Sequence, residues 1–232
     1  IHRLRCPARQ LHEGNQLDVV LDKASLTDEE KSRIFDEKGA LKDNDVSLAY
    51  LLWKKQAKLL NGNDMENLIK LQIIKIQERF KKTADELKKM GLSWEKLAEI
   101  SKDKALLLYK KVTTFREVRY NVTGKNLLYC NFDSFLHVYL RHVEDLKVSN
   151  QFENRDKFQL HEEDVMIVMG HVMEALNDEY QKYKNEHPDG RFYRAGKMAY
   201  YYNGDYYNVY VNSDGSISTF YKGSGNFNAN KQ

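Results

Sequence analysis

The stretch FLHVYLRHV, residues 135–143, decides how the second half of the chain is interpreted. Its apolar residues recur at the spacing of a helix, and two histidines and one arginine interrupt them. Imidazole has an unperturbed pKa of about 6.5, so a helix that carries two of them beside an arginine could supply acid–base chemistry and an anion contact. Packing and solvated roles are the alternatives for the same histidines. The residues that follow the helix favour chemistry.

His137 and His142 are five residues apart, which separates them by about 140° on an ideal helix. We therefore expect only one of them to enter a site, and His142 is the first choice for an acid or a base. Arg141 lies four residues after His137 on the same side of the helix, and it is a candidate contact for an anion.

The composition is typical of a soluble globular protein with one large or two small domains. The 232 residues are 41% hydrophobic and 12% aromatic, and no run of about 18 apolar residues predicts a transmembrane helix. Because the chain begins with Ile1, we expect it to be part of a longer polypeptide. Cys6 and Cys130 do not have metal-binding spacing; they could form one bridge, although a buried thiol is expected for Cys130.

The net charge of +3 combines two unequal halves. Residues 1–124 contain 25 Lys and Arg against 19 Asp and Glu, whereas residues 125–232 contain 12 against 15. The basic excess therefore lies away from the histidine helix, and net charge alone is a weak argument for nucleic-acid binding.

The first half is predicted to be a helical bundle, preceded by an extended segment or a strand at 17–21. Thr27 opens a capping box, Asp64 is the expected cap of a long helix, and Ser93 is the expected cap of a short one. The predicted helices cover residues 27–37, 45–60, 64–90 and 93–100, with another around 106–109. Residues 112–122 fit either a strand or the end of the preceding helix.

No motif with chemistry was found in residues 1–111. The lysines of the 64–90 helix alternate with acidic residues, which is typical of a solvated face. We place a domain boundary at the Thr123-Gly124 break, which gives a helical domain over 1–124, for docking or delivery, and a second domain over 125–232.

The second half combines helices with a sheet. Asn131 or Asp133 caps the histidine helix, a loop follows at 147–157, and a second helix covers 164–186. Strand-like runs at 191–202, 206–211 and 216–222 are separated by Asn203-Gly204 and by a second turn at 212–215, which indicates an antiparallel meander of three to four strands. The predicted fold class is α+β, with two helices packed on this meander.

Eight of the fifteen tyrosines lie between residues 193 and 221. A tyrosine-rich sheet is explained by packing, with the phenol groups at its rim reaching water. The functional alternative is a surface that stacks on bases or contacts phosphates.

The order of these elements, together with DGSISTFY at 214–221, resembles the superfamily of small ribonucleases that groups barnase, EndoU, the tRNA-cleaving colicins and RelE. The resemblance covers residues 125–223 and is greatest to the C-terminal domains of bacterial polymorphic and contact-dependent toxins. These often end in a hairpin of the form Asp-Gly-x-Ile-x-Thr-x-Tyr/Phe. Asp214, Gly215, Ile217, Thr219 and Tyr221 fill that form here.

The resemblance implies an endoribonuclease that needs no metal or cofactor, with a phosphate contact from Thr219 and with Tyr221 close by. It also implies a toxin that is delivered as part of a larger secreted or cell-surface protein and acts in the cytoplasm of a target cell. RNA, with transfer RNA expected, would be its substrate, and a cognate immunity protein would be its partner.

The chemistry requires a base for the ribose 2′-hydroxyl, an acid for the leaving 5′-oxygen, and cations or hydrogen-bond donors for the phosphoryl oxygens. Strand alternation is expected to put Ile217, Thr219 and Tyr221 on one face. The candidate catalytic residues are His142, His137, Arg194, Thr219 and Tyr221, and the candidate substrate contacts are Arg141, Arg191, Lys197, Ser218 and Tyr210.

Two other interpretations compete with a metal-independent ribonuclease. The cluster HEED at 161–164 lacks the ligand spacing of a zinc hydrolase and is expected to be a solvated helix start. A binding module without catalysis, with a helical docking domain and a tyrosine-rich sheet, is the main alternative. A nuclease requires His142 to face the same cleft as Thr219 and either Arg191 or Arg194, whereas a binding module leaves them dispersed.

Overall fold

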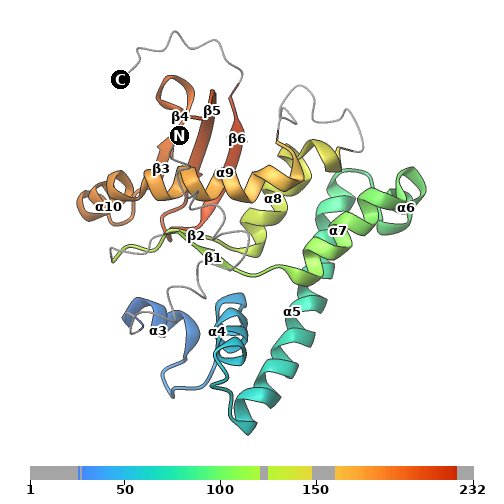
Figure 1. Ribbon diagram of the computed structural model, residues 1–232, viewed down its shortest axis with the longest axis vertical. Helices are drawn as coiled ribbons and strands as arrows, with labels where there is room; N and C mark the ends of the chain where they lie inside the picture. Colours follow the sequence, from blue (N-terminus) through green and yellow to red (C-terminus); the bar gives the residue numbers. More distant parts are fainter. Residues whose placement is uncertain (1–25, 27, 121–124, 148–159, 224–232) are drawn as a thin grey trace, which may run out of the picture.

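A computed structural model describes residue 26 and residues 28–120, 125–147 and 160–223. Within these residues the chain has the predicted α+β fold, with a helical part, a small antiparallel sheet and further helices packed on that sheet (Figure 1). The possible strand at 17–21, the Thr27 cap, Cys6, the break at 123–124 and most of the loop at 147–157 lie outside the described residues.

The helical part contains five helices among the described residues. They are α3 (Asp28–Ile34), α4 (Asp45–Gln56), α5 (Gly62–Lys89), α6 (Trp94–Ile100) and α7 (Lys102–Thr114). The expected ends at 37 and 60 were too late, and the expected helix at 106–109 is part of a longer one. The Ser93 cap is confirmed. Helix α5 begins after Asn61, whose side chain is the cap, and Asp64 supplies the reciprocal bond of a capping box.

Both interpretations of residues 112–122 are partly correct. Helix α7 ends at Thr114, and the short strand β1 (Val118–Arg119) follows and pairs antiparallel with β2 (Tyr129–Cys130). The side chain of Asn131 then caps α8 (Phe132–His142), which resolves the choice between Asn131 and Asp133.

The second predicted helix of this half is two helices in the structure. A short 3-10 turn, η1 (Glu144–Leu146), follows α8, and α9 (Glu162–Ala175) leads into α10 (Asn177–Glu186). Leu176 separates α9 from α10, although its amide still bonds to the Val172 carbonyl at 3.0 Å. The two helices therefore cover nearly the same residues as the single predicted one.

The sheet is the predicted meander. It contains β3 (Phe192–Arg194), β4 (Tyr200–Tyr202), β5 (Asp205–Val211) and β6 (Ile217–Lys222), and all its pairings are antiparallel. Strands β3 and β4 pair with the same edge of β5 and are separated by the turn η3 (Gly196–Met198), while β6 pairs with the other edge. Asn203 and Gly204, with φ of +48° and +94°, form the expected hairpin turn.

A β-bulge changes the facing of the last strand. Tyr210 pairs with Thr219, but Val211 pairs with Ile217, so Ser218 is an extra residue on β6. Ile217 is therefore buried on the core face with Val211, and the prediction that it shares a face with Thr219 is wrong. Thr219 and Tyr221 remain together on the other face, which we call the open face.

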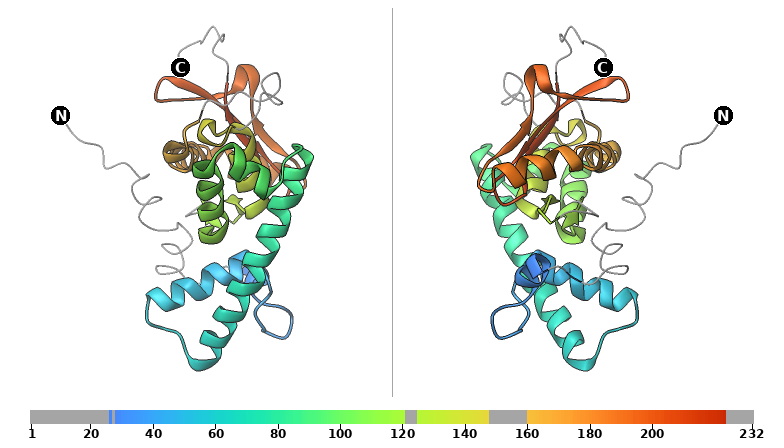
Figure 2. Two further views of the ribbon diagram at one scale, coloured as in Figure 1. Left: turned by 90° about the vertical axis from the view of Figure 1, so that its right-hand side faces the viewer. Right: turned by 90° about the vertical axis from the view of Figure 1, so that its left-hand side faces the viewer.

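Helices α9 and α10 cover the core face of the sheet. Phe192 packs edge-on against Tyr180 of α10 at 5.6 Å, and Tyr202 stacks on His171 of α9 at 5.3 Å. The main core continues from Leu87 of α5 to Phe220 of β6, so it crosses the predicted boundary at 124. Smaller clusters join α3, α4 and the first half of α5, and Figure 2 shows α5 running from them toward the main core.

Candidate functional site

The end of α8 and the strand β6 meet at a polar junction. His142, the last residue of α8, is 1% exposed, and its Nε2 lies 3.2 Å from the Thr219 Oγ1. Its ring also stacks on Tyr221, with centroids 5.1 Å apart and planes 17° apart. The structure therefore brings together three of the predicted site residues from elements that are 77 residues apart in sequence.

His137 belongs to the same junction, which the helical wheel did not predict. Its ring centroid is 5.7 Å from that of His142, and the planes are inclined by 51°. The angle of about 140° describes how two side chains leave an ideal helix axis. The rings extend several bonds beyond that axis, and at this helix end they turn toward each other. His137 is half-buried, so of the two imidazoles it is the one that solvent reaches.

The surroundings of His142 keep it neutral. Burial, followed by the electrostatic effects of His137 and Arg141, lowers the pKa of His142 from 6.5 to about 3. At neutral pH the ring is therefore uncharged, and its Nε2 forms a hydrogen bond with the Thr219 hydroxyl. Such a group can position Thr219 and Tyr221, whereas proton exchange with a substrate suits the more accessible His137.

A groove of about 400 Å³ opens beside His137. Helix α8 forms one wall and helix α5 forms the other. Its lining residues are Lys82, Asp85, Glu86, Lys89, Asp133, Leu136, His137 and Arg141. Lys82 binds both carboxylate oxygens of Asp133, at 2.7 and 2.9 Å, and so links the two walls.

The α5 side of this groove was missed from sequence. Lys82 and Lys89 belong to the helix whose lysines were interpreted as a solvated face, and Lys89 is indeed strongly exposed. No local pattern distinguishes a lysine beside a groove from one that faces solvent only. The long-range packing of α5 against α8 provides that information.

The other predicted site residues are distributed around the sheet. Arg194 lies on the core face, where its Nε is 3.6 Å from a Glu179 carboxylate oxygen of α10, so it does not join Thr219. Arg191, Lys197 and Ser218 are exposed. Tyr210 pairs directly with Thr219 and shares its face. The arrangement therefore gathers the histidine, threonine and tyrosine candidates and leaves Arg194 apart from them.

The Asp-Gly pair of the last hairpin is explained by packing. One carboxylate oxygen of Asp214 accepts bonds from the amide and hydroxyl of Ser216, at 2.9 and 2.6 Å, and the other accepts from the Tyr129 hydroxyl at 3.1 Å. Gly215 has a φ of +87°, and a Cβ there would lie 2.0 Å from the Leu127 carbonyl oxygen. Only glycine fits this position.

A second polar cluster fastens α3 to the β1–β2 pair, and we call it the α3 clasp. Arg33 pairs with Glu117 and lies over the Tyr129 ring at 3.9 Å, and Glu30 pairs with Arg119. Burial raises the pKa of Glu117 to about 7 although Arg33 opposes the shift. All four charged side chains are at least four-fifths buried, which suits a structural lock.

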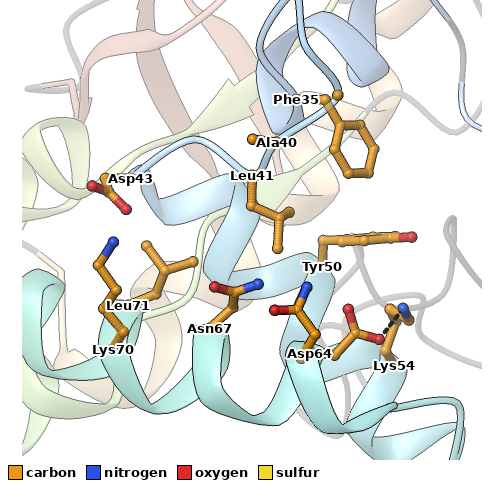
Figure 3. A pocket seen from close by; sticks show the side chains of 12 residues that line it. Phe35, Ala40, Leu41, Asp43, Tyr50, Lys54, Asp64, Asn67, Lys70 and Leu71 are labelled. Atoms are coloured by element: carbon orange, nitrogen blue, oxygen red, sulfur yellow. Dashed lines mark hydrogen bonds and ion pairs between the residues drawn. The ribbon is translucent and has the colours of Figure 1, made fainter.

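A pocket of about 350 Å³ lies between α4, α5 and the loop that precedes α4 (Figure 3). Lys54 and Asp64 form an ion pair at its edge, and Asp64 also accepts a bond from the Asn61 amide. Its charged groups thus join α4 to α5, and we assign no chemistry to it.

No metal or membrane site was found in the part of the chain that the structure describes. There, no three His, Cys, Asp or Glu side chains gather as metal ligands, and no helix is long and apolar enough to span a bilayer. In the HEED segment, Glu162 pairs with Lys111, and His161 Nδ1 is 3.6 Å from an Asp145 carboxylate oxygen. Cys130 is a buried free thiol, as expected.

No protein-family model, no curated protein and no solved structure matches this chain. Chemistry is therefore assigned from the side chains of the α8–β6 junction and the groove beside it.

Proposed function

We propose that the chain is an endoribonuclease that cleaves RNA without a metal ion at the α8–β6 junction. The observation that carries this proposal is the convergence of His137, His142, Thr219 and Tyr221. The His142 ring lies next to a second imidazole, an aliphatic hydroxyl and a phenol, and His137 lines the groove beside this junction. These groups could serve the proton transfers and phosphate contacts of RNA cleavage.

His137 is the proposed proton-transfer group. It takes the proton of the ribose 2′-hydroxyl, and the 2′-oxygen attacks the phosphorus. The bond from phosphorus to the 5′-oxygen then breaks, and a 2′,3′-cyclic phosphate forms. The leaving 5′-oxygen takes a proton from the Tyr221 hydroxyl.

Arg141 and the α5 lysines are the proposed contacts for the RNA backbone. Arg141 lines the same groove as His137, and the guanidinium group binds phosphate through two parallel hydrogen bonds. Lys82 and Lys89 line the opposite wall, where they pair with Asp133 and Glu86, and they would bind a phosphate by exchanging these partners. The helical half of the chain would then supply part of the substrate site, in addition to any docking or delivery role.

His142 is the proposed positioning residue. Its neutral ring forms a hydrogen bond with the Thr219 hydroxyl and stacks on the Tyr221 ring. Both side chains are therefore positioned before a phosphate binds. Preorganised donors in a site of low dielectric stabilise developing charge more strongly than mobile ones do.

The resemblance of residues 125–223 supports the biological setting of this proposal. It favours a toxin that is delivered within a larger secreted or cell-surface protein and cuts RNA, with transfer RNA as the expected target, in the cytoplasm of the recipient cell. A cognate immunity protein is the expected partner.

The test is RNA cleavage by the purified chain in EDTA, with total bacterial RNA and with or without added cell extract. We expect discrete fragments that end in 2′,3′-cyclic phosphate. We also expect His137→Gln to reduce the rate about 10²- to 10⁴-fold, the usual contribution of a general acid or base. His161→Gln, at an exposed histidine beside Asp145, is the matched control and should cleave as the wild type does.

Intact RNA in every sample, from chains that circular dichroism shows to be folded, would overturn the ribonuclease proposal. The binding module with a tyrosine-rich sheet would then be the better description. Equal cleavage by the wild type and His137→Gln would retain the activity but remove His137 from its site.

A further inference from the structure

The open face of the sheet carries a row of side chains that ends at the proposed site. Tyr193 of β3 pairs with Tyr210 of β5, and Tyr210 pairs with Thr219 of β6. Directly paired residues of antiparallel strands point to the same face. The row therefore leads across three strands from Tyr193 to Thr219, whose hydroxyl contacts His142.

The two tyrosines of this row form a stacked pair away from the core. Their ring centroids are 6.1 Å apart, and the planes differ by only 18°. Tyr193 is 53% exposed to solvent. The pair therefore offers an aromatic surface to a ligand that approaches the open face.

The distances along the row suit a ligand that also reaches Thr219. Neighbouring strands are about 4.8 Å apart, so the backbones at Tyr210 and Tyr193 lie about 5 and 10 Å from that at Thr219. Bases attached one or two positions from a phosphate at Thr219 would therefore reach the tyrosine rings.

A cation lies beside the same surface. The Gly196 amide donates a 2.8 Å bond to the Asn208 side chain, and Asn208 shares the open face with Tyr210. The turn η3 is thus held against the open face, and it carries the exposed Lys197. Lys197 therefore offers a positive charge to a polyanion that approaches the open face.

We propose that Tyr193 and Tyr210 stack on unpaired bases next to the scissile phosphate, so that the substrate is single-stranded or looped RNA. This inference rests on the proposed ribonuclease function. Aromatic side chains stack on bases that are free of a helix, whereas bases in duplex RNA present only their edges. Lys197 would contact the backbone between or beside the stacked bases.

The experiment uses one RNA hairpin with an unpaired loop, and the same RNA annealed to its full complement, in EDTA. We expect the chain to cut the loop and to leave the duplex intact. Tyr193→Leu should raise KM for the loop substrate at least 5-fold with little change in kcat, and Tyr193→Phe, which keeps the ring, should restore the wild-type KM. Tyr201→Leu is the control, because Tyr201 is 59% exposed on β4 and lies outside the row.

A second measurement separates this inference from the proposed activity. The His137→Gln variant, with and without Tyr193→Leu, is titrated with a short unpaired RNA by fluorescence anisotropy. We expect the Tyr193→Leu change to weaken binding at least 5-fold. If the loop is cut but Tyr193→Leu changes neither KM nor binding, or if duplex is cut equally well, the stacking surface is wrong and the nuclease stands. If no RNA is cut but Tyr193→Leu weakens binding, the stacking surface stands and the nuclease fails.

Discussion

The α8–β6 junction and the α3 clasp both bury titratable side chains, but they do so in different ways. In the clasp, opposite charges pair, Arg33 with Glu117 and Glu30 with Arg119. In the junction, a buried neutral imidazole contacts a hydroxyl, a phenol and a second imidazole that solvent reaches.

This difference indicates that the α3 clasp stabilises the fold, whereas the α8–β6 junction can bind a ligand. Ion pairs that are closed off from water hold two elements together and have little left to offer a ligand. A neutral base beside an accessible one, at the edge of a groove, has positioned groups that a substrate can still reach. Buried titratable groups are therefore informative mainly through what lies next to them.

Glu117→Leu should have the largest effect on stability. It leaves the Arg33 guanidinium buried without its carboxylate, which we expect to reduce the free energy of unfolding by about 3–5 kcal/mol. Urea denaturation measures this loss, and Arg33→Leu combined with Glu117→Leu should recover most of it. RNA cleavage per folded molecule should not change. A decrease of less than about 1 kcal/mol in the free energy of unfolding would show that the α3 clasp contributes little to stability.

His142→Ala should affect both stability and cleavage. Removal of a fully buried ring leaves a cavity and an unsupported Thr219 hydroxyl, so the free energy of unfolding should fall by about 2–4 kcal/mol. His137→Ala, at the half-buried position, should change it by only about 0.5 kcal/mol while reducing cleavage more than any other single change. Equal destabilisation by the two variants would remove the distinction between the buried and the accessible histidine.

The two regions should respond to pH with opposite signs. The pKa of His142 falls from 6.5 to about 3 on folding, so its contribution to stability is complete above about pH 6.5 and is lost on acidification toward pH 3. The pKa of Glu117 rises from 4.5 to about 7, so its contribution is complete below pH 4.5 and is lost as the pH rises toward 7.

Unfolding free energies at pH 4.5 to 7 test this opposition. Each group can contribute a slope of at most about 1.4 kcal/mol per pH unit. Compared with the wild type, His142→Ala should lose less stability on acidification, and Glu117→Gln should lose more. If the stability of both variants changed with pH in the same way, the opposite pKa shifts of His142 and Glu117 would be wrong.

Thr219→Val should have the smallest effect. It keeps the shape of the side chain but removes the bond to His142, which is worth about 0.5–1.5 kcal/mol of stability. Thermal unfolding measures the change, and Thr219→Ser, which keeps the hydroxyl, is the matched control. A Thr219→Val chain as stable as the wild type would indicate that this contact is not formed in solution.

Local sequence was sufficient to predict the elements that carry the junction. The apolar period of α8 and the Asn203-Gly204 hairpin depend on neighbouring residues alone, and both are present. The cap of α8 was narrowed to Asn131 or Asp133, and it is Asn131. His142, Thr219 and Tyr221 were selected from the resemblance and from the chemistry of RNA cleavage, and the structure places them in contact.

Features that depend on long-range packing were not predictable in the same way. The bulge at Ser218 moves Ile217 to the core face, and strict alternation could not show this. The groove beside His137 exists because α5 packs near α8, although its lysines have the pattern of a solvated face. Arg194 turns toward α10 because its strand position faces the core.

An NMR titration of the imidazole signals from pH 8 to pH 4.5, with isotopically labelled histidine, tests directly whether His142 is buried and neutral. The signal that disappears in His142→Ala belongs to His142. We predict that it remains that of a neutral imidazole throughout this range, because its pKa lies at about 3. A midpoint near pH 6.5 for this signal would mean that His142 is solvated, and the assignment of His142 as the buried positioning residue would be wrong.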